Sequence, residues 1–522
     1  MRNLWWVYIG RVLIGYDIEV RADIEVNEFI CNGIIEKVKE IFSNLISNKR
    51  KKIMVYIPEQ QGQLFFEGYS EEELLHVISE KQNEKQALEA LDEIDWDFKN
   101  SITQYLSHKF HSYPARFIPQ IPLTFIKLFT KEKDVVFDPM CGCGTTLVES
   151  FLNGRNSIGN DFNPLAVLIS KVKTTLIPES EFRYIEKKII KMKKYLDLDY
   201  CKIEERTDSL PNRTISKIFN KTIIGKLEAI REMILEIKDE NHNDLYDFGR
   251  VAFSATIWSL VENGNGLDVE NTFLKKVLFM KKELLEMAKI ITNQSYTNVI
   301  QGDARKLELD DNMVDLIVTS PPYVNALDYY RTHMYNMLWL GMDFGLLKKH
   351  EIGGHSHFMM NRFRLLSEYL ADMLRSMIEM NRVLKNGNIC AIVVGNSSLE
   401  YELIESHKYF ESFAKDIGFE YIKTFFRNID KTRKYTSANI GQIDDEFIVV
   451  LQKVSNSEIS ARDDDFITQS VRKQMEAFRE QIKKESGTSI RGKRPTKERL
   501  LKNVERISVA IDTIQDDIKM KE

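Results

Sequence analysis

The chain has 522 residues, of which 43% are hydrophobic, and a formal net charge of −5. This length suggests two to four domains with an ample core, and a chain that is not basic overall must make any contact with nucleic acid through local patches. Five scattered cysteines favour a reducing cytoplasm over a disulfide framework, and Cys141 and Cys143 have no second Cys or His pair nearby, so no metal site is expected.

Residues 1–105 are predicted to form a small α+β domain. The segments 4–13 and 17–26 are rich in β-branched and aromatic residues, which is typical of strands. Two further short strands are expected on either side of a turn at 59–62, and a charged helical stretch follows up to residue 94. We find no chemical motif here, so a recognition or assembly module and a structural appendage are both open.

The first chemical motif follows a predicted buried strand at 133–137. It reads Asp138-Pro-Met-Cys-Gly142-Cys-Gly144-Thr145-Thr146 and leads into a helix at 147–152. The two glycines permit a tight turn and a close approach of the backbone to a ligand, and the two threonines can cap the N–H groups of the helix. A strand, a glycine turn and a helix N-terminus together predict a dinucleotide-type cradle.

A carboxylate is expected beside this cradle. The next strand, 157–161, ends in Asp161 about 20 residues after the glycines, which suits a ribose diol. Residues 176–295 carry apolar residues at helical spacing and are predicted to be a helical insertion. The sheet is expected to resume at 298–303, a segment that ends in Asp303.

The second motif is Ser320-Pro321-Pro322-Tyr323, which follows the apolar strand 314–318. The two prolines stop any strand pairing, because neither can donate a backbone hydrogen bond. A polar side chain, a rigid turn and an aromatic ring are therefore presented at the strand end where α/β sheets bind ligands. The polar and aromatic residues that come next are candidates for positioning a substrate: Asn325, Asp328, Tyr329 and Arg331.

The later part of the chain completes the sheet. We expect a substrate loop at 341–358, whose three histidines lack the cysteine partners of a zinc site. A helix from 366 to 384 should end in a cap at Gly387. Strands at 389–395, 421–426 and 446–451 would bring the sheet to seven, and residues 455–522 are predicted to be a charged helical tail.

The two motifs resemble those of S-adenosylmethionine-dependent DNA methyltransferases of the amino-group family, which modify cytosine N4 or adenine N6. The family's cofactor signature, Asp-Pro-Phe-Cys-Gly-Ser-Gly-Thr-Thr, is matched at 138–146, with departures at Met140 and Cys143 that leave the glycines intact. Its Pro-Ala-Lys-Phe-x-Pro element is matched at 114–119 with Arg116 in place of lysine, and its catalytic tetrapeptide at 320–323. The resemblance covers 106–175 and 296–454.

The resemblance implies a Rossmann-like, seven-stranded class I methyltransferase core, with 106–175 as the cofactor half and 296–454 as the catalytic half. Ser320 and the carbonyl of Pro321 would accept the hydrogens of a base amino group, and Tyr323 would stack on a base flipped out of duplex DNA. In the family, a residue at the position of Asp303 contacts the adenine amino group of the cofactor. The residues expected around S-adenosylmethionine are Phe117, Asp138, Gly142, Gly144, Thr145, Thr146, Asp161 and Asp303.

The same residues bear on several alternatives. None of the eleven prolines is followed by Cys, which excludes the Pro-Cys nucleophile of C5-cytosine methylation. Serine at 320 favours cytosine N4, while N6-adenine methylation stays open, and an RNA guanine-N2 methyltransferase would usually show Asp-Pro-Pro-Tyr. A protein glutamine methyltransferase would show Asn-Pro-Pro-Tyr, and an inactive nucleic-acid-binding subunit would show damaged motifs. We therefore expect a site-specific DNA methyltransferase of restriction-modification or phage defence, in which the cofactor motif precedes the tetrapeptide.

The tail carries two patterns. A heptad seam must be buried somewhere, so self-association through this helix is one expectation; the seam consists of Leu500, Val504, Ile507, Ile511, Ile514 and Ile518. The run 483–506 holds nine basic and three acidic residues, which suits contact with a phosphate backbone. We expect the tail to increase the affinity for DNA without contributing catalytic residues. The alternative is that its helix only folds back on the core. Restriction or defence proteins are conceivable partners.

Overall fold

The computed structural model describes residues 12–14, 16–18, 84–99, 101–198, 214–264, 266–291, 295–354, 357–429, 445–484 and 496–518. The chain divides into two compact units, Met1–His76 with Asn100–Ile102, and Val77–Lys99 with Thr103–Glu522. In the first unit, β1 (Val12–Ile14) and β2 (Tyr16–Ile18) form an antiparallel hairpin. The strands expected around the turn at 59–62 lie outside the described residues. None of the described helices is long and apolar enough to cross a membrane.

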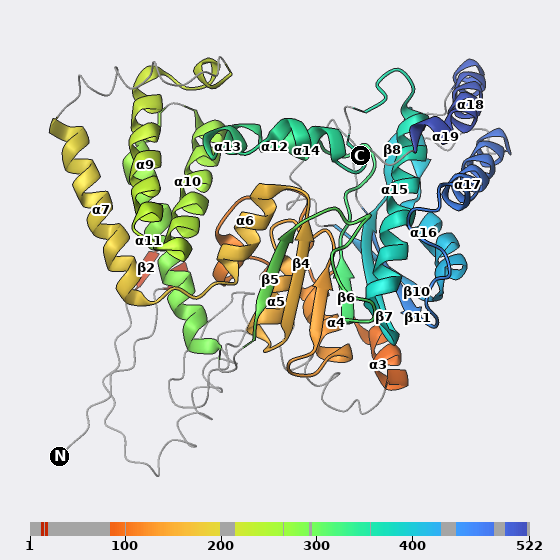
Figure 1. The fold of residues 1–522 in the computed structure, drawn as a ribbon, viewed down its shortest axis with the longest axis horizontal. Helices are drawn as coiled ribbons and strands as arrows, with labels where there is room; N and C mark the ends of the chain where they lie inside the picture. Colours follow the sequence, from red (N-terminus) through yellow and green to blue (C-terminus); the bar gives the residue numbers. More distant parts are fainter. Residues whose placement is uncertain are drawn as a thin grey trace, which may run out of the picture. The chain divides into compact units, whose positions relative to one another are not determined.

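A seven-stranded sheet forms the centre of the second unit (Figure 1). The strand order is β10-β11-β7-β6-β3-β4-β5. The five strands from β7 to β5 pair in parallel, whereas β11 is antiparallel to both of its neighbours. This is the predicted Rossmann-like methyltransferase core. Its strands are β3 (Val135–Asp138), β4 (Asn156–Asp161), β5 (Thr297–Gln301), β6 (Val314–Thr319), β7 (Leu384–Gly395), β10 (Phe419–Asn428) and β11 (Asp445–Lys453).

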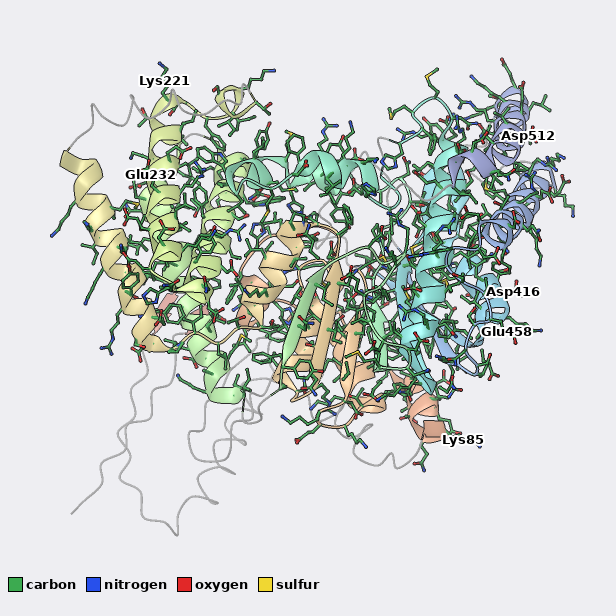
Figure 2. The ribbon with its side chains drawn as sticks, in the orientation of Figure 1. Lys85, Lys221, Glu232, Asp416, Glu458 and Asp512 are labelled. Carbon is green, nitrogen blue, oxygen red and sulfur yellow. The ribbon has the colours of Figure 1, made fainter. Side chains whose placement is uncertain are left out.

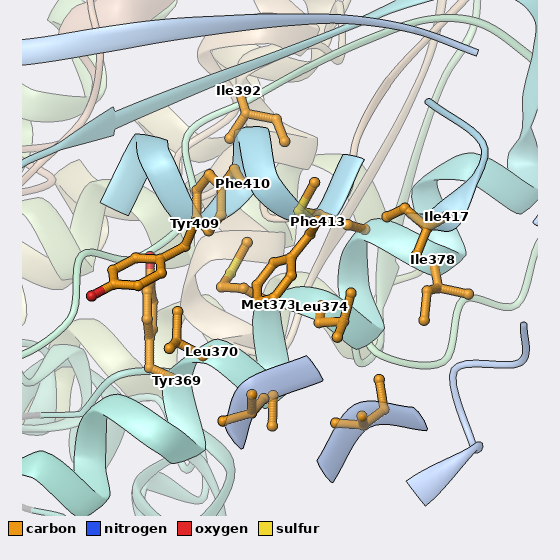
Figure 3. Close-up of a cluster of buried hydrophobic side chains, with 14 of the residues drawn as sticks. Tyr369, Leu370, Met373, Leu374, Ile378, Ile392, Tyr409, Phe410, Phe413 and Ile417 are labelled. Atoms are coloured by element: carbon orange, nitrogen blue, oxygen red, sulfur yellow. The ribbon is translucent and has the colours of Figure 1, made fainter. Parts of the chain in front are cut away.

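One side of the sheet is covered by α15 (Arg362–Val383) and α16 (Ser406–Ala414). Nearly every residue of α15 is buried, because the helix has the sheet on one side and other helices on the rest of its surface. Figure 3 shows apolar side chains of α15, such as Leu370 and Met373, packed with Phe410 and Phe413 of α16 and with Ile392 of β7.

The transition from α15 to β7 corrects the expected cap at Gly387. The helix ends at Val383 and the strand begins at once with Leu384. Gly387 has a φ of +84° inside β7, where the pairing with β6 shifts from Val314–Leu384 to Leu316–Ile389. The positive φ therefore serves a bulge in a strand instead of a helix end.

The predicted helical insertion forms a second apolar core with α6 (Pro164–Lys173). Asn163 accepts a hydrogen bond from the backbone N–H of Leu165 and Pro164 occupies the first turn, which fixes the start of α6. Exposed charged side chains, such as Lys221 and Glu232, lie on the outer surface of the insertion (Figure 2). Its helices are α7 (Glu179–Leu198), α9 (Lys221–Asp239), α10 (Asn243–Asn263) and α11 (Val269–Ile290).

The tail folds back on α15. It contains α17 (Asp464–Lys484), α18 (Lys497–Asp512) and α19 (Ile514–Asp517). The C-terminal part of the heptad seam is buried in the main core, and Leu500 and Val504 are partly buried against it. Buried Arg375 of α15 donates to Asp464 (2.7 Å) and to the carbonyl of Ile518 (3.1 Å). The seam is thus covered within the chain, and residues 485–495 of the basic run lie outside the described residues.

Candidate active site

A cavity opens where β3, β4, β5 and β6 end. It encloses about 820 Å³ of empty space, part of which is open to solvent. Gly142 of the first motif and Ser320 of the second line it, together with Asp161 and Asp303. These residues are up to 178 positions apart in the sequence, and the parallel strands bring them together at one edge of the sheet.

The glycine turn is held in place from behind. Gly142 and Gly144 have φ angles of +50° and +79°, and Gly144 precedes the first residue of α5 (Thr145–Leu152). The Ser170 hydroxyl donates to the Gly142 carbonyl (2.9 Å), and the buried Lys173 ammonium donates to the Cys143 carbonyl (2.9 Å). Both carbonyls are therefore fixed by α6, which leaves the turn little freedom to move.

Asp161 joins the glycine turn to the end of β4. Its Oδ2 accepts a hydrogen bond from the Gly142 N–H (2.8 Å), and its Oδ1 accepts one from the Asn163 N–H (2.8 Å). Burial raises the pKa of this carboxyl to about 6. The carboxylate lies in the cavity wall, as a group for binding hydroxyls must.

Asp138 is placed differently: it is fully buried and is not among the residues that line the cavity. Its carboxylate accepts from the hydroxyls of Thr146 (2.9 Å) and Thr319 (2.7 Å) and from the Met140 N–H (3.2 Å). Burial raises its pKa to about 7. Asp138 and Thr146 thus connect the glycine turn to the residue before Ser320, a contact that local sequence patterns do not reveal. Thr145 lies in the cavity wall.

Asp303 lines the cavity with a carboxylate that is already paired. Arg305 donates through Nε to Oδ1 (2.9 Å) and through Nη2 to Oδ2 (2.7 Å), and Arg305 also bonds to Asp372 of α15 (2.8 Å). Burial by itself would raise the pKa of Asp303, but the hydrogen bonds and charge of Arg305 lower it below its ordinary value. The group is therefore a fixed anion on the cavity wall.

The tetrapeptide turns at the end of β6. Ser320 and Pro322 line the cavity, whereas Pro321 is buried. The Tyr323 hydroxyl donates to Glu446 Oε1 on β11 (3.0 Å), and Glu446 Oε2 accepts from Arg427 (2.6 Å). Burial, together with the Glu446 carboxylate, raises the pKa of Tyr323 well above its ordinary value. The tyrosine ring is thus held at both ends, by the turn and by a neighbouring strand.

The four candidate substrate-positioning residues separate in the structure. Tyr329, the first residue of α12 (Tyr329–Thr332), lines the cavity and stacks on Tyr113 with 6.0 Å between ring centroids. Asn325 donates to the carbonyls of Gly353 (3.1 Å) and Ser398 (3.0 Å), so it fixes the backbone after the tetrapeptide. Asp328 is buried before α12, and Arg331 is exposed on it. These three are not among the residues that line the cavity.

Sequence reasoning missed part of the wall. The segment 341–358 was expected to be a loop, but it contains α14 (Phe344–His350), because the Asp343 carboxylate accepts hydrogen bonds from Gly345 and Leu346 (2.8 and 3.0 Å). His350 and Glu351, directly after it, line the cavity. Among the described residues, no group of three His, Cys, Asp or Glu could hold a metal ion.

Glu351 is the most unusual of the missed residues. Its Oε1 accepts from the Tyr329 N–H (2.5 Å), and its buried Oε2 has no hydrogen-bond partner among the described residues. Burial raises the pKa of this carboxyl to about 8. No sequence motif marked it, because its importance comes from its contact with the start of α12.

The cavity wall combines two kinds of surface. Asp161 and Asp303 supply carboxylates, and Phe117, Met140 and Ile352 supply aromatic and aliphatic surface. Such a wall suits a ligand that carries hydroxyl groups, an amino group and a flat heterocycle. It also places these groups next to Ser320, so a second ligand can meet the first inside one cavity.

Comparison with known proteins agrees with this arrangement. The sequence profile of the N6 and N4 methyltransferase family, described as DNA methylase, matches residues 15–172 and 314–508, which is more than half of the chain. The chain belongs to this family. The methylase is therefore a DNA methyltransferase of the amino-group type, as its two motifs predicted.

Individual relatives are more distant. The methylase is 26% identical over 399 residues to the type II methyltransferase M.MvaI of Kocuria varians, a match that covers 64% of this chain and 87% of that protein. It is 24% identical over 319 residues to the type II methyltransferase M.BsoBI of Geobacillus stearothermophilus, with 53% and 62% covered. A SAM-dependent methyltransferase structure from Methanosarcina mazei covers 63% of the methylase and 97% of its own chain, at 11% identity and a TM-score of 0.28.

Proposed function

We propose that the methylase transfers a methyl group from S-adenosylmethionine to the exocyclic N4 of a cytosine flipped out of duplex DNA, as the modification activity of a restriction-modification or defence system. The observation that carries the proposal is that Ser320 lines the same cavity as the glycine turn and Asp161. The relatives named above are type II methyltransferases, which supports a modification role.

The cavity wall fits the cofactor. S-adenosylmethionine supplies an electrophilic methyl group when it is bound. The Asp161 carboxylate would accept hydrogen bonds from the ribose hydroxyls, and Asp303 would accept one from the adenine amino group. Phe117 would pack against the bound molecule, and the open glycine turn would let the backbone approach it closely.

The tetrapeptide would act on the base. An exocyclic amino nitrogen is a poor nucleophile, because its lone pair is delocalised into the ring. Ser320 Oγ and the Pro321 carbonyl would accept the two amino hydrogens and allow the nitrogen to become tetrahedral. Acceptors fixed before the substrate arrives cost no reorganisation during the reaction, and the two prolines together with the anchored Tyr323 provide this fixation. No covalent intermediate is needed.

The choice of base rests on Ser320. A serine at this position favours cytosine N4, and an aspartate would favour adenine N6. We expect nucleoside analysis of DNA methylated by the purified methylase to show N4-methylcytosine, and N6-methyladenine as the sole product would refute the base assignment. Sequencing of methylated DNA from cells that express the protein would give the recognition site.

A variant tests the role of the serine. Ser320→Ala should lose about 10²–10³ in turnover, as expected for one transition-state contact, while calorimetry shows an unchanged affinity for S-adenosylmethionine. Asp161→Asn is the matched control and should show the opposite pattern, with weakened cofactor binding. Wild-type turnover in the Ser320 variant would reduce the tetrapeptide to a structural turn.

A further inference from the structure

Two consecutive methionines are exposed on the segment that joins α14 to α15. Met360 is 88% exposed and Met359 is 62% exposed, and Met360 is the most exposed of the large hydrophobic side chains in the described part of the chain. A single exposed apolar residue is ordinary. Two consecutive exposed methionines give a larger apolar surface, and such surfaces usually mark a site of interaction. The Met359 sulfur accepts a hydrogen bond from Arg362 (2.8 Å), which holds that side chain in place.

The tip is held rigidly despite its exposure. The Asn361 N–H donates to the Phe358 carbonyl (3.0 Å), and the Phe358 ring lies under the Arg364 guanidinium at 4.7 Å. From the tail, Arg506 donates to the carbonyl of Met360 (3.1 Å), and Asn361 donates to the carbonyl of Arg506 (3.0 Å). The backbone of the tip is therefore fixed from both sides, so the two methionine side chains are presented in one place.

The same segment begins at the cavity. Ile352 lines the cavity, and the Gly353 carbonyl accepts from the Asn325 N–H, two residues after the tetrapeptide (3.1 Å). Met360 is eight positions after Ile352 in the sequence, so the tip lies at most about 28 Å from the cavity wall. A substrate whose reacting group enters the cavity therefore lies within reach of the tip.

Arginine and carboxylate side chains surround the tip. Arg364, Arg499 and Arg506 are partly exposed there, whereas Arg362 is buried and donates to the His357 carbonyl (3.2 Å). Glu400 pairs with Arg499 (3.9 Å) and Arg506 (3.3 Å), Asp517 pairs with Arg364, and the charges of Asp516 and Asp328 act on Arg364 and Arg362. Carboxylates thus balance the guanidinium groups, and the feature of the tip that suits a base stack is its exposed apolar surface beside the cavity.

We propose that Met359 and Met360 form a wedge that enters the base stack of duplex DNA and fills the space left by the flipped base. The inference rests on the proposed function, since a wedge of this kind is needed only by an enzyme that extrudes a base. Apolar side chains, methionine among them, are used for insertion between base steps, and the unbranched thioether adapts to an irregular gap. The wedge offsets part of the cost of unstacking.

The test compares two duplexes that carry the sequenced recognition site. One is fully paired, and the other has an abasic position opposite the target base, so that the target leaves the stack at little cost. Met360→Ala should lose about tenfold in affinity and turnover on the paired duplex but less than about twofold on the abasic one. Met360→Leu should restore most of the loss, because it restores apolar volume.

A matched control separates the wedge from a general surface effect. Val454 is 55% exposed and follows β11 at the end of the sheet opposite the cavity, so Val454→Ala should bind both duplexes like wild type. Equal losses on the two duplexes, or no loss for the Met359→Ala, Met360→Ala double variant, would overturn the wedge. A lower oligomer mass of that double variant in light scattering would also overturn it, because the tip would then be a contact between copies. If the wild-type protein methylates neither duplex, the proposed function itself fails.

Discussion

Gly144 offers the sharpest test of how the glycine turn is built. It has a φ of +79°, and a Cβ placed on it would lie 3.0 Å from Ser170 Cβ and 3.1 Å from Ser170 Cα. The Cα belongs to the backbone of α6 and cannot rotate away. Gly144→Ala must therefore either strain the turn or displace the turn from the helix behind it.

The magnitude has two parts. A left-handed conformation costs an alanine about 1–2 kcal/mol, and forcing a methyl group into a packed site adds about 1–3 kcal/mol. Gly341 isolates the first part, because its φ is +67° and a Cβ there would meet nothing within 4 Å. We expect Gly341→Ala to lower the free energy of unfolding by about 1 kcal/mol and Gly144→Ala by about 2–4 kcal/mol.

Urea unfolding followed by tryptophan fluorescence measures this difference on the wild type and the two variants. Calorimetry with S-adenosylmethionine provides a second readout, in which only Gly144→Ala should weaken binding. Equal destabilisation of the two alanine variants would refute the reasoning, because the close packing of the turn on α6 would then have no energetic weight.

Three further predictions concern other parts of the structure. Asp138→Ala should lower the free energy of unfolding by about 2 kcal/mol or more in the same assay, because the buried hydroxyl of Thr319 loses its acceptor and that of Thr146 keeps only the Val318 carbonyl (3.1 Å); unchanged stability would contradict the link. Glu149 is buried beside His108 (2.7 Å), and burial raises its pKa from an ordinary value of 4.5 to about 8. Between these two values the folded chain keeps a proton that the unfolded chain has released, so the free energy of unfolding should fall as the pH rises from about 4.5 to about 8. Glu149→Gln should flatten that decline in urea titrations, and an unaltered slope would assign it to other groups. Truncation before α18 should expose buried isoleucines worth about 1.5–3 kcal/mol each and produce an unstable protein by thermal melting; a truncated protein of wild-type stability that only binds DNA more weakly would support a tail used for DNA contact alone.

Local patterns predicted the features that depend on neighbours in the sequence. The apolar runs that became β3 and β6 could be read because buried parallel strands are apolar on both faces. The glycine turn and the tetrapeptide were recognisable because each is a short contiguous chemical unit. The residues that lie between the glycine turn and the tetrapeptide in the sequence contain no contiguous chemical unit of this kind.

Long-range contacts account for most of what the sequence did not reveal. Asp138 and Thr319 are 181 positions apart, and only the pairing of β3 with β6 brings them within 2.7 Å. Gly387 looked like a helix cap because glycine favours both caps and bulges, and the partner strand decides between them. Glu351 matters because of the backbone it contacts, and no residue near it in the sequence indicates this.

The carboxylate of Asp138 has a consequence for the order of events in the enzyme. The Asp138 side chain is hydrogen-bonded both to the glycine turn with α5 and to Thr319, the residue before the tetrapeptide. A displacement of one of these two segments would therefore be transmitted to the other. The two ligands would then bind cooperatively. Thermodynamic linkage makes this effect mutual: the factor by which bound cofactor raises the affinity for DNA must equal the factor by which bound DNA raises the affinity for the cofactor. A buried hydrogen-bonded carboxylate would in this way make an enzyme loaded with its methyl donor the form best prepared to engage DNA.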